Sequence, residues 1–226
     1  MEIIAHRGAS ARAAENTLAA VRLATGCADY VEVDVRLSRD RVPVVMHDPT
    51  VDRTTNGKGR VGDFTAAELR ALDAGQGEHV PTLEEVCGLV EGRTGLCVEL
   101  KEPGSGYHVC DVLERHSPRP LLVVSFHGAS LAAVHEIMPE VPLGLVSSRP
   151  GIPRPRRDED VPLHVFLLRF DVLSKEIVRE ARARGMRVIP WTLDAEAEWE
   201  EACRLGVDGF ATDDPCRARE WAASRK

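Results

Sequence analysis

Two histidines in this sequence each stand directly after a short apolar run. His6 follows the apolar residues 3–5, and His47 follows the apolar residues 43–46. Two imidazoles near one substrate can divide proton transfer, one removing a proton from a nucleophile and the other protonating a leaving group. Either histidine alone is equally compatible with an ordinary turn. The chemical interpretation therefore depends on what lies beside them.

A pair of carboxylates occurs in the run Val31-Glu32-Val33-Asp34-Val35. Side chains alternate along a strand, so Glu32 and Asp34 share one face while the valines share the other. Two unpaired buried carboxylates would each cost several kcal/mol. A divalent cation with a preference for oxygen ligands, Mg²⁺ or Ca²⁺, would remove that cost. The alternative is exposure at a rim with partners such as Arg36.

Three further positions could contact a ligand. Glu99 and Lys101 share a face of another apolar run, so Glu99 could be a third metal ligand and Lys101 could hold a phosphate oxygen. They could equally pair with each other. Arg7, next to His6, is suited to a phosphate oxygen. Trp191 ends another apolar run and could form an apolar wall for a substrate, or belong to the core.

Short β-branched runs alternate with amphipathic stretches along most of the chain, which is typical of a parallel sheet covered by helices. Eight such runs favour an α/β fold of the (β/α)8 TIM-barrel type, with an open doubly wound sheet as the alternative. Asp213 and Asp214 precede Pro215 and are predicted to cap the last helix. The predicted strands are Glu2–Ala5, Tyr30–Leu37, Leu96–Leu100, Leu121–Ser125, Leu143–Val146, Val165–Leu168, Val188–Trp191 and Gly209–Thr212.

One region interrupts this alternation. A short extra strand at Val42–Met46 is followed by a polar stretch and a short helix at Ala66–Leu72. We predict a single domain over residues 1–226, with a small insertion after the second strand at about residues 48–80. A second irregular stretch, Ser147–Asp160, is predicted to be a surface loop.

Composition narrows the class of protein. Of the 226 residues, 43% are hydrophobic and 29% charged, as in ordinary globular proteins, and the formal net charge of −7 argues against a nucleic-acid partner. The sequence has no apolar run long enough for a membrane span and no recognisable signal peptide, so we expect no stable membrane insertion and a cytoplasmic location. The six cysteines form no Cys-x-x-Cys pair and are predicted to be reduced thiols.

These motifs together resemble the glycerophosphodiester phosphodiesterase family. The resemblance implies a distorted TIM barrel that hydrolyses a glycerophosphodiester, such as glycerophosphocholine or glycerophosphoethanolamine, to an alcohol and sn-glycerol 3-phosphate. The matching stretches lie in the family's order along nearly the whole chain. They are His6-Arg7-Gly8, Glu15-Asn16-Thr17, Glu32-Val33-Asp34, His47-Asp48, Arg53-Thr54-Thr55-Asn56-Gly57, Pro81-Thr82-Leu83-Glu84-Glu85, Val98-Glu99-Leu100-Lys101, Trp191-Thr192, Gly206-Val207-Asp208-Gly209 and Thr212-Asp213.

The resemblance also implies roles for individual residues. One divalent cation, Mg²⁺ or Ca²⁺, would be held by three carboxylates, and two histidines would act as general acid and base. Two cationic side chains would bind the phosphate. The metal ligands would be Glu32, Asp34 and Glu99, and the general acid and base would be His6 and His47. The phosphate-binding side chains would be Arg7 and Lys101.

Other functions compete with this interpretation. A lysophospholipase D or sphingomyelinase D-like phospholipase on the same barrel would keep these residues but needs an apolar lip for an acyl chain. A barrel that binds a phosphorylated metabolite without turnover is a weaker alternative, because both histidines are present. An aldolase-type barrel with Lys101 as nucleophile leaves Glu32, Asp34 and the histidines unexplained.

Overall fold

A barrel of parallel strands forms the centre of the protein. The computed structural model describes residues 1–153 and 161–225, and in that part of the chain the strands follow the order β8-β7-β6-β5-β4-β2-β1-β9. Every strand predicted from the sequence is present, which confirms the predicted barrel. The strands are β1 (Glu2–Ala5), β2 (Tyr30–Leu37), β4 (Gly95–Leu100), β5 (Leu121–Ser125), β6 (Leu143–Ser147), β7 (Val165–Arg169), β8 (Arg187–Trp191) and β9 (Gly209–Thr212).

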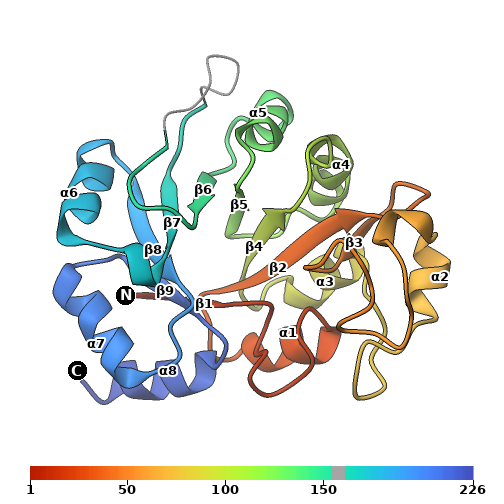
Figure 1. The fold of residues 1–226 in the computed structure, drawn as a ribbon, viewed down its shortest axis with the longest axis horizontal. Helices are drawn as coiled ribbons and strands as arrows, with labels where there is room; N and C mark the ends of the chain where they lie inside the picture. Colours follow the sequence, from red (N-terminus) through yellow and green to blue (C-terminus); the bar gives the residue numbers. More distant parts are fainter. Residues whose placement is uncertain (154–160, 226) are drawn as a thin grey trace.

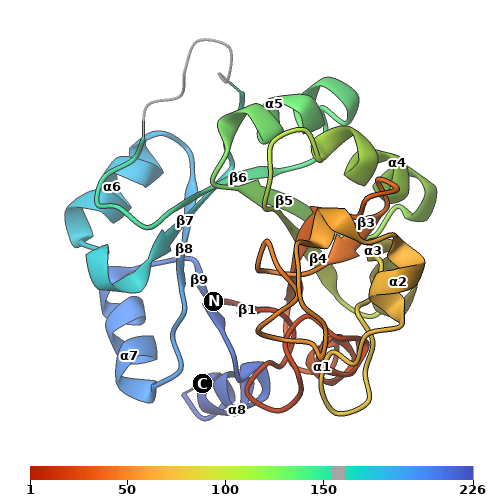
Figure 2. The same cartoon turned by 45° about the vertical axis from the view of Figure 1, so that its right-hand side comes forward.

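The barrel closes between β8 and β9. The backbone N–H of Asp208 donates to the carbonyl of Val188, and the N–H of Leu193 donates to the carbonyl of Ala211, both at 2.9 Å. Figure 2 shows the strands as a ring with helices outside it. An open doubly wound sheet would leave these edges unpaired, so that alternative is wrong.

Helices follow the strands as the sequence pattern predicts, and their ends have side-chain caps. Thr17 caps α1, and Thr82 and Glu85 form a reciprocal capping box at the start of α3. Figure 1 shows α6 (Lys175–Ala183) and α7 (Glu196–Leu205) on one side of the barrel and the insertion helix α2 (Ala66–Arg70) on the other. The outer helices are α1 (Leu18–Ala24), α3 (Leu83–Val90), α4 (Gly106–His116), α5 (Gly128–Ile137), α6 (Lys175–Ala183), α7 (Glu196–Leu205) and α8 (Pro215–Ala223).

The strands have two apolar faces with different partners. Val31, Val33 and Val35 of β2 point outward into the core beneath the helices. Ile4, Val124 and their neighbours point inward and fill the barrel. Because side chains alternate along a strand, Glu32 and Asp34 must share the inner face, as predicted.

The insertion after β2 has its own small core. It begins with β3 (Pro43–Val45), antiparallel to β2, and continues with η1 (Val61–Asp63) and α2 (Ala66–Arg70). A cluster separate from the barrel core holds these pieces together. Its buried members are Val44, Met46, Val51, Val61, Leu69, Ala74 and Val80.

Cys27 and Cys216 form a disulfide, so the prediction of six reduced thiols is wrong for this pair. Their Cα atoms are 4.7 Å apart, although 189 residues separate them in sequence. The bond joins the turn that follows α1 to the first turn of α8, where the first and last strand-helix units meet. The remaining cysteines are free thiols: Cys87, Cys97, Cys110 and Cys203.

The connection between β6 and β7 is irregular where it is described. Residues 148–153 and 161–164 contain no helix, while residues 154–160 of the predicted loop Ser147–Asp160 lie outside the described residues. Ser147 itself is the last residue of β6. Among the described residues, no helix is long and apolar enough to cross a membrane.

Candidate active site

Three buried carboxylates meet inside one end of the barrel. Glu32 and Asp34 come from β2 and Glu99 from β4, and Asp34 is paired in register with Glu99. Each side chain offers an oxygen within 4.8 Å of the others. All three residues are at least nine-tenths buried. A buried acidic cluster of this kind requires cations nearby.

Two cationic side chains, Lys101 and Arg7, contact Asp34. Its Oδ1 lies 3.0 Å from the Lys101 ammonium, and its Oδ2 lies 3.3 Å from Arg7 Nε. The amide of Asn16 also donates to Oδ2 at 2.8 Å. Burial works to raise the pKa of Asp34, but Lys101 and Arg7 outweigh burial and lower that pKa to about 2. Asp34 is therefore a fixed negative charge.

Glu32, unlike Asp34, has no cationic side chain bonded to it in the described part of the chain, and its pKa is raised. Its Oε2 accepts the backbone N–H of Arg7 at 2.8 Å, while its buried Oε1 has no hydrogen-bond partner. Burial and the neighbouring charge of Asp34 raise the pKa of Glu32 to about 8. The predicted alternative, in which Arg36 neutralises these acids at the rim, is wrong because Arg36 instead donates to the His47 carbonyl.

Glu99 completes the set and fits a cation site. Its Oε1 accepts from Lys101 Nζ at 2.6 Å, and burial raises its pKa. An unpartnered buried carboxylate oxygen is costly, and a divalent cation with oxygen ligands would satisfy it. The unpaired oxygen of Glu32, facing two other carboxylates, is thus the observation that matches a metal site.

His6 faces this cluster from the end of β1. Its Nδ1 lies 2.7 Å from Asp213 Oδ1, so Nδ1 carries the proton and Nε2 is left for a ligand. Burial works to lower the pKa of His6, but the carboxylates of Asp213 and Glu32 outweigh burial and raise it. The predicted cap of α8 is confirmed at Asp214, whose side chain accepts the backbone N–H of Arg217, whereas Asp213 binds His6 instead.

His47 has a similar arrangement at the end of β3. Its Nδ1 lies 2.6 Å from Asp48 Oδ1, which leaves its Nε2 free. Burial lowers the pKa of His47, and the charges of Asp34 and Asp48 offset this only in part. The site therefore contains two histidines, each backed by a carboxylate, whose pKa values are displaced in opposite directions.

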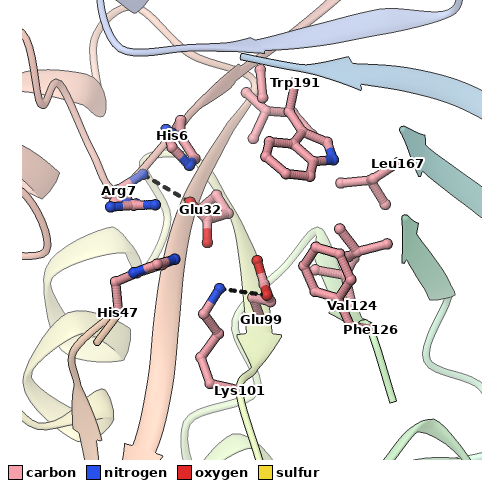
Figure 3. Close-up of a pocket in the computed structure, with 13 residues that line it drawn as sticks. His6, Arg7, Glu32, His47, Glu99, Lys101, Val124, Phe126, Leu167 and Trp191 are labelled. Carbon is pink, nitrogen blue, oxygen red and sulfur yellow. Dashed lines mark hydrogen bonds and ion pairs between the residues drawn. The ribbon is translucent and has the colours of Figure 1, made fainter. Parts of the chain in front are cut away.

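A cavity of about 100 Å³ opens onto these groups. Figure 3 shows His6, His47 and Glu32 on one side of this cavity, and Trp191 and Phe126 on the other. The rings of Phe126 and Trp191 meet edge to face with centroids 6.0 Å apart. Val124, Val146 and Leu167 complete the apolar side.

A second cavity, of about 360 Å³, adjoins the first and shares His6 and Arg7 with it. Its walls are polar, with Ser10, Arg12 and Gln76 among the lining residues. His6 and Arg7 therefore line both cavities.

All eight residues selected from the sequence come together at this end of the barrel. Seven line the inner cavity, and Asp34 lies beside them in contact with Lys101 and Arg7. Sequence reasoning missed Asp213 as the partner of His6, and it missed Phe126. The position of Phe126 was readable, since it continues the inner-face alternation of Leu122 and Val124 on β5.

Comparisons with known proteins identify the family of this chain. Residues 6–217 match the glycerophosphoryl diester phosphodiesterase family. The chain belongs to that family. It is 37% identical over 232 residues to a glycerophosphodiester phosphodiesterase of Caldanaerobacter subterraneus subsp. tengcongensis, covering 94% of each chain. A Bacillus altitudinis glycerophosphodiester phosphodiesterase is 32% identical, with 96% of each chain covered.

A solved structure supports the same assignment. The chain superimposes on a phosphodiesterase of Oleispira antarctica, in complex with the product sn-glycerol-3-phosphate, with a TM-score of 0.91. The two are 31% identical, and the match covers 99% of this chain and 97% of the other. The predicted family, fold and class of activity, a phosphoric diester hydrolase, are therefore confirmed.

Proposed function

We propose that this glycerophosphodiester phosphodiesterase hydrolyses water-soluble glycerophosphodiesters to an alcohol and sn-glycerol 3-phosphate with one divalent cation, Mg²⁺ or Ca²⁺. The observation that carries the proposal is the buried carboxylate cluster with an unpaired Glu32 oxygen, faced by two carboxylate-backed histidines. Glu32, Asp34 and Glu99 would hold the cation. Bound there, the cation would stabilise negative charge on the phosphoryl oxygens.

Arg7 and Lys101 supply positive charge beside the carboxylates. The Arg7 guanidinium is oriented by Glu15 and Asp34, and the Lys101 ammonium by Glu99 and Asp34. Both cations therefore reach the cavity with fixed geometry and are suited to bind the non-bridging phosphate oxygens.

The two histidines divide the proton transfer. His47, whose pKa is lowered, favours the neutral imidazole and is suited to take the proton of the nucleophile through Nε2. The nucleophile is either water or the glycerol 2-hydroxyl, whose cyclic phosphate product water then opens. His6, whose pKa is raised, favours the protonated imidazole and is suited to give its Nε2 proton to the oxygen of the departing alcohol. The carboxylates at Nδ1 hold both rings in orientation.

The apolar side of the cavity favours a small organic group. Trp191 and Phe126 present ring edges and faces on which the carbon chain of glycerol can rest. The apolar lining is confined to the inner cavity and the adjoining cavity is polar, so these two cavities offer no apolar lip for an acyl chain. This limit disfavours a lysophospholipase D or a sphingomyelinase D-like activity.

An assay with paired substrates tests the proposal. The protein is incubated with Mg²⁺ or Ca²⁺ and with glycerophosphocholine, glycerophosphoethanolamine or lysophosphatidylcholine, and the released alcohol is measured. We expect turnover of the two deacylated substrates and far slower turnover of the lipid. Preferred turnover of lysophosphatidylcholine would instead assign the site to lipids.

Two further expectations remain predictions. The single-domain organisation over residues 1–226 and the cytoplasmic location rest on the sequence pattern alone. The predicted reduced state of all six cysteines no longer supports that location, because Cys27 and Cys216 are bonded.

A further inference from the structure

Arg53 lies in the insertion, five residues after Asp48, and holds two carboxylates at once. Its Nε and Nη2 donate to Asp48 Oδ2 and Oδ1 at 2.7 and 3.1 Å. Its Nη1 and Nη2 donate to Glu15 Oε2 and Oε1 at 2.7 and 2.8 Å. Forked pairs of this kind fix a carboxylate in orientation as well as in position.

Each of these carboxylates contacts a residue of the site. Asp48 Oδ1 lies 2.6 Å from His47 Nδ1, and Glu15 Oε1 accepts from Arg7 Nη1 at 2.8 Å. Asp48 thus connects Arg53 to His47, and Glu15 connects Arg53 to Arg7. No other guanidinium among the described residues is bonded to both carboxylates.

The stability of the fold does not explain this arrangement. The Arg53 side chain is 48% exposed, whereas those of Glu15 and Asp48 are 22% and 23% exposed. Ion pairs to a half-exposed cation add little to the free energy of unfolding, because water and salt screen them. Their main effect is to restrict the two carboxylates to one orientation.

We propose that Arg53 is a positioning residue through which the insertion orders the active site: it holds Asp48 against His47 and Glu15 against Arg7. The proposal rests on the functions proposed above for His47 and Arg7. The Asp48 contact acts on proton transfer, so its loss lowers kcat. The Glu15 contact acts on phosphate binding, so its loss raises KM.

Three variants separate this role from a structural one. Arg53→Ala removes both contacts, and Arg53→Lys keeps the positive charge but cannot form the bidentate hydrogen bonds. Arg39→Ala is the matched control, because Arg39 also bridges to the insertion, 3.1 Å from Glu68, and is 56% exposed. No contact joins Arg39 to Asp48 or Glu15 among the described residues.

We expect Arg53→Ala to lower kcat/KM roughly 10- to 100-fold, since small displacements of reacting groups have effects of this size. The loss should be divided between kcat and KM, with the unfolding midpoint close to that of the wild type. Guanidinium ion added to the buffer should restore part of the activity of Arg53→Ala, and Arg53→Lys should remain impaired. Arg39→Ala should match the wild type. Equal activity of Arg53→Ala and Arg39→Ala would overturn the proposal.

A readout without turnover keeps the two proposals distinct. If the wild type hydrolyses no glycerophosphodiester, the proposed function fails, and the role of Arg53 is judged from the His47 imidazole alone. Its ¹⁵N chemical shifts report which ring nitrogen carries the proton. A change in Arg53→Ala that is absent in Arg39→Ala supports positioning of His47 through Asp48, and unchanged shifts in both variants refute it.

Discussion

Glu32 and Asp34 stand two residues apart on the same face of β2, yet only Asp34 is neutralised by the protein. Asp34 contacts Lys101 and Arg7, whereas one buried oxygen of Glu32 has no partner. The pKa values follow, about 2 for Asp34 and about 8 for Glu32. The site thus has one carboxylate more than its own cations satisfy.

Replacing Glu32 by Gln should separate metal binding from folding. A neutral amide resembles the protonated carboxyl that the raised pKa of Glu32 favours without a cation, so the variant should unfold in EDTA no more easily than the wild type. Saturating Mg²⁺, at about 100 times its dissociation constant, should stabilise the wild type by about 2.7 kcal/mol and the variant by far less. Thermal unfolding with EDTA and with Mg²⁺ checks both statements. Equal stabilisation of both proteins by Mg²⁺ would place the cation elsewhere.

The His6–Asp213 pair gives a second prediction. Asp213→Asn leaves a side chain of the same size but removes the carboxylate that accepts the Nδ1 proton of His6. Since a positioned general acid contributes about 10²–10⁴-fold, we expect kcat to fall by at least ~10²-fold. Steady-state kinetics measure this fall.

Asp214 provides the matched control for Asp213. Asp214 accepts the backbone N–H of Arg217 at 3.1 Å and caps α8. Asp214→Ala should cost about 1 kcal/mol of the free energy of unfolding and leave kcat unchanged. The reverse pattern, with activity lost in Asp214→Ala and kept in Asp213→Asn, would be incompatible with Asp213 as the partner of His6.

Much of this site follows from strand periodicity alone. The alternation in β2 places Glu32 and Asp34 together on the inner face, and the order of strands brings Glu99 beside them. The role of Asp213 is different, because Asp213-Asp214-Pro215 reads equally well as a helix cap. Only the pairing of β9 with β1, which brings residues 207 positions apart into contact, distinguishes the two aspartates.

The disulfide was unpredictable for a related reason. Cys27 and Cys216 lie far apart in sequence, without a spacing motif, and come together only because the first and last strand-helix units are neighbours in the barrel. The eight strands were predictable because each carries its own local pattern. Contacts between the two ends of the chain form only when all the strands have closed into a barrel, so no local sequence pattern predicts them.

The disulfide should contribute to stability and not to catalysis. It links α1 to α8 and closes a loop across 189 residues, so it restricts the unfolded chain. Replacing both cysteines by Ser should lower the free energy of unfolding by about 2–4 kcal/mol with kcat unchanged. Urea unfolding measures the difference, with Cys203→Ser, a free exposed thiol, as control. Identical unfolding of oxidised and reduced wild type would contradict this account.

Glu85 should make stability depend on pH under acid conditions. Partial burial works to raise its pKa, but the N–H of Thr82, together with Arg70 and His79, outweighs burial and lowers it from about 4.5 to about 2. A depressed carboxyl pKa stabilises the fold above the unfolded value, and that stabilisation is lost as the pH falls from about 4.5 towards about 2.

Glu85→Gln therefore tests this dependence. We expect it to cost about 1 kcal/mol at pH 7, as for other capping residues, and to lose less stability than the wild type between pH 4.5 and pH 3. Urea unfolding at several pH values measures both effects. Glu84→Gln, on the same helical turn, should keep the wild-type slope, and a wild-type slope in Glu85→Gln would refute the assignment.

The most direct test of the central claim is the release of sn-glycerol 3-phosphate from glycerophosphoethanolamine, followed with a coupled dehydrogenase. Wild type would be compared in Mg²⁺, in Ca²⁺ and after EDTA treatment, alongside His6→Ala. The account predicts release that requires both a divalent cation and His6. Full release by the EDTA-treated protein, or by a folded His6→Ala variant, would contradict it.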